Sequence, residues 1–134
     1  MESDLLKMDT SVLAYLGDAV FSSWIRRRLI EAGWGSIDRL HRQTVRYVRA
    51  DAQAAALAFL TPGLTEQEAD LARRARNKRI SSKPRHTDPL TYKKATAFEA
   101  LVGYLYLAGE TERLNELLEQ AAAYIEGGGG NEPG

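Results

Sequence analysis

The 134-residue chain contains no cysteine, so disulfide bonds and zinc–thiolate sites are excluded. It also lacks an apolar run approaching the roughly 18 residues that suggest a membrane-spanning helix. The N-terminal residues 1–11 are acidic and contain no apolar stretch of the kind found in signal peptides. These absences lead us to expect one globular domain that does not contact the membrane and that resides in the cytoplasm.

The sequence shows no alternating strand pattern, whereas apolar residues recur at spacings of three and four. Asp9, Thr10 or Ser11 can cap a first long helix that ends near Ala32, because Gly33 and Gly35 follow. Further helices are predicted over residues 36–48, 50–60, 65–76, 91–107 and 111–125. Residues 77–89 are predicted to form a loop between the helices at 65–76 and 91–107. We therefore predict an all-α domain over residues 1–126 and a disordered Gly-rich tail over 127–134.

The net charge is zero, which by itself argues against a nucleic-acid partner. The segment from Arg73 to Lys94, however, contains nine basic residues against one acid, Asp88, and so carries a charge of +8. Local charge matters because electrostatic attraction is screened within about 8 Å at physiological salt. A charge run is more often a solvated face, but this one is also a candidate surface for phosphate groups. The candidate phosphate contacts are Arg76, Lys78, Lys83, Arg85, Lys93 and Lys94.

Two acidic residues lie in the middle of otherwise apolar helices, Asp18 in the first helix and Glu99 in the fifth. Their neighbours at helical spacing are all small, namely Ser11, Ala14, Gly17 and Ser22 around Asp18, and Ala95, Thr96, Ala100 and Gly103 around Glu99. A carboxylate in such a strip lies in a shallow trough that is open to a metal ion and a substrate backbone. Glycine within a helix costs about 1 kcal/mol relative to alanine. Gly17 and Gly103 therefore predict the close approach of another backbone, from a packed helix or a ligand.

If the two helices pack side by side, Asp18 and Glu99 face one another and repel, unless one binds a proton or a cation lies between them. Because the chain has no cysteine and only two histidines, the available ligands favour Mg²⁺, with Mn²⁺ as the alternative ion. Other interpretations remain open. A single acid on a helix is usually solvated or paired with an arginine, and strips of small residues also serve as helix-packing surfaces.

Two motifs resemble those of a known family. Leu-Ala-Tyr-Leu-Gly-Asp-Ala-Val, residues 13–20, resembles the ribonuclease III signature helix, whose usual form is L-E-F-L-G-D-[AS]-V. Residues 98–107 resemble the second acidic helix of that family. The resemblance extends over residues 9–125. Ala14 and Thr96 stand where typical ribonuclease III has two further acids, and we expect no double-stranded-RNA-binding domain after the last helix. In both respects the chain resembles Mini-ribonuclease III, the short branch of the family that has a catalytic domain alone.

This resemblance implies the ribonuclease III endonuclease-domain fold, a two-fold homodimer, and Asp18 and Glu99 as catalytic residues and ligands of Mg²⁺. It implies cleavage of double-stranded RNA to 5′-phosphate products, in the maturation of large-subunit (23S) ribosomal RNA precursor. A ribosomal protein is a further candidate partner. Tyr15 occupies the position where the family packs a phenylalanine across the dimer interface, and the alternative for Tyr15 is a core aromatic within one chain.

Two other functions are compatible with the sequence. The loss of two acids could mark a non-catalytic protein that binds structured RNA or a ribosome-assembly intermediate. Cleavage of a duplex with Mg²⁺, abolished by EDTA, would exclude that alternative. The chain could also be a helical protein-interaction module, which predicts no salt-sensitive RNA binding.

Overall fold

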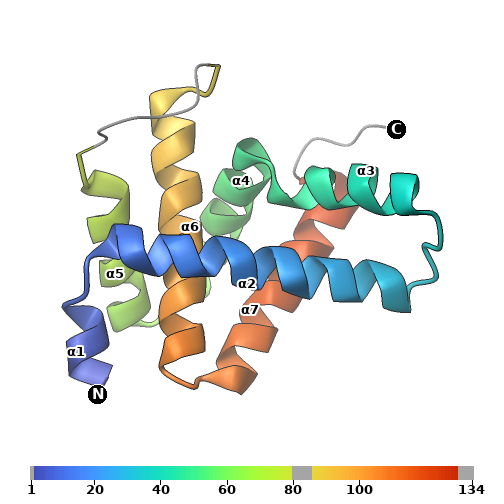
Figure 1. Cartoon of the computed structure of the whole chain (residues 1–134). Coiled ribbons are helices and arrows are strands. Elements are labelled where there is room, and N and C mark those ends of the chain that lie inside the picture. The colour runs from blue at the N-terminus through green and yellow to red at the C-terminus, as the bar shows by residue number, and fades with distance from the viewer. Residues whose placement is uncertain (1, 80–85, 130–134) are drawn as a thin grey trace.

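The computed structural model describes residues 2–79 and 86–129, and within these residues the chain forms helices and no β-strand (Figure 1). The predicted all-α class is therefore confirmed. The α-helices are α1 (Glu2–Leu6), α2 (Thr10–Glu31), α3 (Ile37–Val48), α4 (Ala50–Leu60), α5 (Glu66–Asn77), α6 (Pro89–Leu107) and α7 (Thr111–Tyr124). A final helical turn, Ile125–Gly129, includes the first residues of the predicted tail. The rest of that tail and the centre of the predicted 77–89 loop lie outside the described residues.

The helix ends follow the chemistry of neighbouring residues. The Asp9 carboxylate accepts a hydrogen bond from the backbone N–H of Ser11 at 2.8 Å and so caps α2. A capping box begins α5, since the side chains of Thr65 and Glu68 each accept a hydrogen bond from the other's backbone N–H. The helix α6 begins about two residues earlier than predicted, because Asp88 caps it and a proline fits the first helical position. The short helix α1 was not predicted.

The helix α2 crosses α6, and the backbones of the two helices touch at the crossing (Figure 1). A Cβ atom on Gly17 would lie 1.7 Å from the backbone oxygen of Glu99. A Cβ atom on Gly103 would lie 2.0 Å from the backbone oxygen of Leu13. Neither position has room for a side chain, so the predicted close approach at the two glycines is confirmed, and the approaching backbone belongs to the other helix.

The core surrounds this crossing. Phe21 of α2 and Phe98 of α6 make an edge-to-face contact, with ring centroids 5.0 Å apart and planes at 80°. Other fully buried side chains come from α2, α5, α6, α7 and the turn after α7, namely Leu13, Ile25, Leu71, Leu101, Leu105, Leu118 and Ile125. None of the helices in the described part of the chain is long and apolar enough to cross a membrane.

Ion pairs fasten the outer helices to one another. Arg113 of α7 donates to both carboxylate oxygens of the buried Glu68 of α5, at 2.9 Å and 2.7 Å. Arg28 of α2 binds Glu119 of α7 at 2.7 Å and Glu126 of the following turn at 2.8 Å. Because these arginines are paired with acids of the same chain, their charges stabilise the fold and are not free surface charges.

The backbone contact at the crossing predicts the effect of adding one methyl group. Gly17→Ala and Gly103→Ala should each lower the free energy of unfolding by at least about 1–3 kcal/mol, the usual cost of overpacking, because each methyl meets a backbone oxygen. Gly35→Ala is the matched control, since a Cβ atom there meets nothing within 4 Å. Urea denaturation measures all three, and wild-type stability for Gly17→Ala would contradict the described crossing.

Candidate functional site

An open groove lies beside the crossing of α2 and α6. Its lining includes both predicted acids together with small residues of the predicted trough, namely Ser11, Ala14, Asp18, Thr96 and Glu99. Asp18 directly follows Gly17, and Glu99 supplies the backbone oxygen that Gly17 contacts. The two acids are therefore brought together by the same contact that joins the helices.

The two carboxyl groups of this acid pair, Asp18 and Glu99, differ in their surroundings. Asp18 is exposed, whereas Glu99 is partly buried. Burial is the main cause that raises the pKa of Glu99 to about 8, and the charge of Asp18 and a hydrogen bond between the two carboxyl groups contribute to the same rise. This is the behaviour of two like charges that share a confined site. At neutral pH the metal-free pair holds a proton on Glu99.

The donors of the groove fit a divalent cation that prefers oxygen. Within residues 2–79 and 86–129, no three acidic, histidine or cysteine side chains converge on one point. The chain therefore offers two carboxylates, and water and substrate would have to supply the other ligands. Mg²⁺ suits such a set, because it retains several waters and commonly binds through one or two carboxylates and a phosphate.

The two positions where the resemblance places further acids contribute little to a metal site. Ala14 is buried and has no donor atom in its side chain. The hydroxyl of Thr96 donates to the backbone oxygen of Tyr92 at 2.9 Å. Its proton is thus committed to the helix, and Thr96 can act toward a water only as a hydrogen-bond acceptor.

Gln53 of α4 is a functional candidate that the sequence analysis missed. Its side chain is buried and lies near Glu99, where its hydrogen bond counteracts part of the rise in the Glu99 pKa. The Oε1 atom of Gln53 is buried and accepts no hydrogen bond from the described residues. An unsatisfied buried acceptor costs about 1–3 kcal/mol. A glutamine within an alanine-rich helix was the only signal available in the sequence.

The predicted RNA contacts are placed only in part. Lys93 and Lys94 lie in the first turns of α6, shortly before the groove residue Thr96, and within the described residues neither forms an ion pair. Lys78 forms an ion pair with Asp9, the residue that caps α2. Arg76 is exposed near the end of α5. The remaining two, Lys83 and Arg85, lie outside the described residues.

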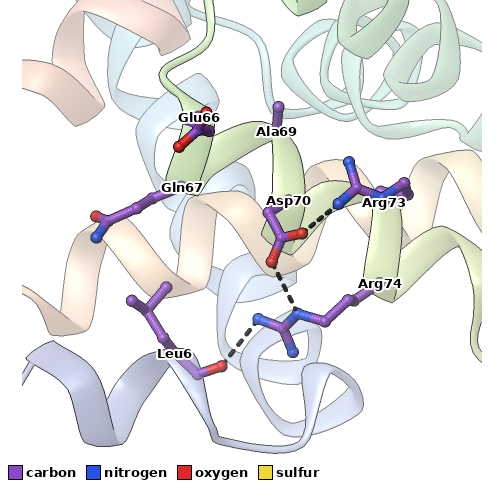
Figure 2. Close-up of a pocket in the computed structure, with 7 residues that line it drawn as sticks. All are labelled: Leu6, Glu66, Gln67, Ala69, Asp70, Arg73 and Arg74. Atoms are coloured by element: carbon purple, nitrogen blue, oxygen red, sulfur yellow. Dashed lines mark hydrogen bonds and ion pairs between the residues drawn. The ribbon is translucent and has the colours of Figure 1, made fainter.

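Two further arginines of the basic segment line a second hollow, between α1 and α5 (Figure 2). Figure 2 shows Asp70 between Arg73 and Arg74, and both arginines form ion pairs with it. Arg74 also donates to the backbone oxygen of Leu6 at 2.8 Å. Both arginines thus pair with Asp70, and Arg74 attaches α1 to α5, which favours a structural role for them.

Tyr15 is 84% exposed and lies on the groove side of α2. The alternative that it is a core aromatic within one chain is therefore wrong. Val12 and Ile30 of the same helix are also exposed, at 52% and 61%. The outer side of α2 thus exposes apolar side chains among its polar ones.

The raised pKa of Glu99 predicts how the stability of the metal-free protein depends on pH. The unfolded chain releases this proton near pH 4.5 and the folded chain near pH 8, so Glu99 stabilises the fold at low pH. Between about pH 5 and pH 8 the free energy of unfolding should fall by at most about 1.4 kcal/mol per pH unit. Thermal denaturation in EDTA measures this fall.

Glu99→Gln is the matched control and should remove the pH dependence in this window. Lys78 lowers the pKa of Asp9, and Arg28 lowers that of Glu126, so these acids titrate below the window. A wild-type protein whose stability stays constant from pH 5 to pH 8 would contradict the buried, coupled state of Glu99.

The chain is similar to known proteins over most of its length. The Ribonuclease III domain model matches residues 11–110. The chain is 52% identical over 123 residues to a Mini-ribonuclease 3 of Symbiobacterium thermophilum, covering 92% of this chain and 95% of the relative. It is 47% identical over 116 residues to a Mini-ribonuclease 3 of Brevibacillus brevis, covering 87% of each.

A crystal structure of a protein from Fusobacterium nucleatum is also similar, with a TM-score of 0.77 and 29% sequence identity. The match covers 83% of this chain and 90% of that one. The matched family model spans most of the chain, including both acids of the groove. The chain therefore belongs to the ribonuclease III family, within its Mini-ribonuclease 3 branch, and is an endoribonuclease.

Proposed function

We propose that this endoribonuclease cleaves double-stranded RNA in a Mg²⁺-dependent reaction at the groove that holds Asp18 and Glu99. The observation that carries the proposal is the acid pair, two carboxyl groups from separate helices that share one proton beside an open groove. Such a pair is poorly stable without a cation and becomes a ligand set when a divalent ion replaces the proton. Mn²⁺ is the alternative ion.

In this mechanism Asp18 and Glu99 would hold the ion. When bound, Mg²⁺ supplies Lewis-acid activation of water and of the scissile phosphate. The exposed carboxylate of Asp18 is already open to the groove, whereas Glu99 must lose its proton before both oxygens can bind a cation. The small side chain of Ala14 leaves space in the groove lining for the RNA backbone. The proposed products carry 5′-phosphate and 3′-hydroxyl ends.

The proposed RNA track runs from the groove along the basic residues near it. Lys93 and Lys94 are the best placed, because they precede Thr96 on the same helix and form no ion pair within the described chain. Lys78 and Arg76 would extend the track, with Lys83 and Arg85 as predictions that the described residues leave open. Duplex RNA offers mainly phosphates and 2′-hydroxyl groups to such a surface, so we expect recognition by shape and charge.

We further propose a two-fold homodimer in which the outer side of α2, with Tyr15 in its second turn, faces a second copy. The exposed Val12, Tyr15 and Ile30 support this proposal, because apolar side chains on the surface of a helix favour burial against a partner. Each of the two symmetric active sites would then cleave one strand of the same duplex.

The proposed biological substrate is the precursor of large-subunit (23S) ribosomal RNA, processed in the cytoplasm, with a ribosomal protein as a candidate partner. This part of the proposal rests on the resemblance of the motifs around Asp18 and Glu99 to those of Mini-ribonuclease III. Sequencing of precursor RNA ends in cells that lack the protein would identify the substrate.

The acid pair predicts that Asp18→Asn and Glu99→Gln each lower cleavage of a duplex RNA at least about 100-fold at saturating Mg²⁺, because one ligand of the ion is lost. The assay follows a labelled duplex on a denaturing gel, with EDTA as the metal-free control. Circular dichroism and sedimentation verify that each variant keeps its fold and association state. Normal turnover by either variant, or wild-type cleavage in EDTA, would defeat the proposal.

The proposed track predicts a change in the salt dependence of binding. In an Asp18→Asn background that does not cut, replacing both Lys93 and Lys94 by glutamine should weaken duplex binding and lower the log–log salt slope by about one per lysine. Arg27→Gln is the matched control, since Arg27 is exposed but pairs with Glu31 at the far end of α2. An unchanged slope in the double variant would exclude these lysines as phosphate contacts.

A further inference from the structure

Gln53 of α4 has a polar side chain that is buried among apolar residues. It is only 1% exposed, and its neighbours Ala52, Ala54, Ala56 and Leu57 along α4 are buried apolar residues. The helix α4 packs against α6, the helix that carries Glu99. A buried amide is unfavourable unless it is hydrogen-bonded, so the partners of Gln53 indicate why it is there.

The side-chain amide of Gln53 joins three helices. Its Nε2 atom donates to the backbone oxygen of Val48, the last residue of α3, at 3.0 Å. The side chain also forms a hydrogen bond with Glu99 of α6, which favours the carboxylate form of that acid. Since Gln53 itself lies in the first turns of α4, one amide fixes the junction of α3 and α4 relative to Glu99.

A role in capping α3 does not account for the whole side chain. Nε2 serves the Val48 carbonyl, but Oε1 remains buried without a partner among the described residues. If Gln53 served only to fill space and to cap α3, its unsatisfied buried acceptor would destabilise the fold with no compensating benefit. The contact with Glu99 uses the amide N–H and leaves Oε1 without a donor, but it gives the amide a second task that an apolar side chain could not perform.

We propose that Gln53 is a positioning residue of the acid pair, whose amide N–H holds the Glu99 carboxylate in the orientation that a divalent cation requires. This inference rests on the proposed metal site at Asp18 and Glu99. The amide binds one carboxylate oxygen and leaves the remaining lone pairs for the ion. Hydrogen-bond partners of this kind orient metal-ligating side chains, and their loss typically weakens metal affinity about 10–100-fold.

Gln53→Met tests the inference, because methionine is similar in length and volume but has no amide. The probe is Mn²⁺ alone, titrated into the RNA-free protein and followed by electron paramagnetic resonance. We expect Mn²⁺ binding about 10-fold weaker than in the wild type. In duplex cleavage the Mg²⁺ concentration for half-maximal rate should rise about 10-fold, with kcat at saturating Mg²⁺ near the wild-type value.

Thr44→Val is the matched control. Thr44 of α3 is also a buried polar residue, and its hydroxyl donates to the backbone oxygen of Leu40 at 2.7 Å. It does not line the groove and does not contribute to the pKa shift of Glu99. It should leave Mn²⁺ affinity unchanged. Gln53→Leu is a second amide-free variant, to be used if circular dichroism shows that Gln53→Met is not folded.

Asp18→Asn, titrated in parallel, separates the inference from the proposed function. If Asp18→Asn loses Mn²⁺ binding while a folded Gln53 variant binds as the wild type does, the positioning role is overturned and the metal site stands. If Asp18→Asn itself binds Mn²⁺ like the wild type, the proposed metal site fails, and the role of Gln53 fails with it.

Discussion

The contact between the backbones of α2 and α6 at Gly17 and Gly103 is the constraint on which the rest of the structure depends. Two helices approach this closely only where neither carries a side chain at the point of contact. The same contact sets the separation of the acids, because Asp18 is adjacent to Gly17 and the opposing backbone oxygen belongs to Glu99. Fold and site therefore share one packing requirement.

This arrangement places like charges together at a cost that the surrounding core must offset. Glu99 lies deep enough for burial to be the main cause of its raised pKa, and Asp18 adds to the effect. The edge-to-face contact of Phe21 and Phe98 lies on the same two helices and stabilises their crossing. A proton neutralises the pair in the metal-free protein, and under the proposed function a divalent cation takes its place.

The charge of this neutral chain is unevenly distributed, with +8 between Arg73 and Lys94. Several arginines are bound to acids of the same chain, as Arg113 is to Glu68 and Arg28 is to Glu126. In these ion pairs the arginine charge is neutralised by an acid and stabilises the fold. Lys93 and Lys94, on α6 shortly before the groove residue Thr96, form no such pair within the described residues, so under the proposed function their charge is available to a phosphate backbone.

Helix positions, the glycine contact and the two acids could all be predicted from the sequence, because each leaves a local mark. Caps such as Asp9 and Thr65 bind backbone groups two or three residues away, and small residues recur at helical spacing around Asp18 and Glu99. Only the tertiary structure decided that Tyr15 is exposed and that Gln53 reaches Glu99. Exposure and long-range hydrogen bonds depend on which distant segment packs against a residue, and no spacing along the chain encodes that.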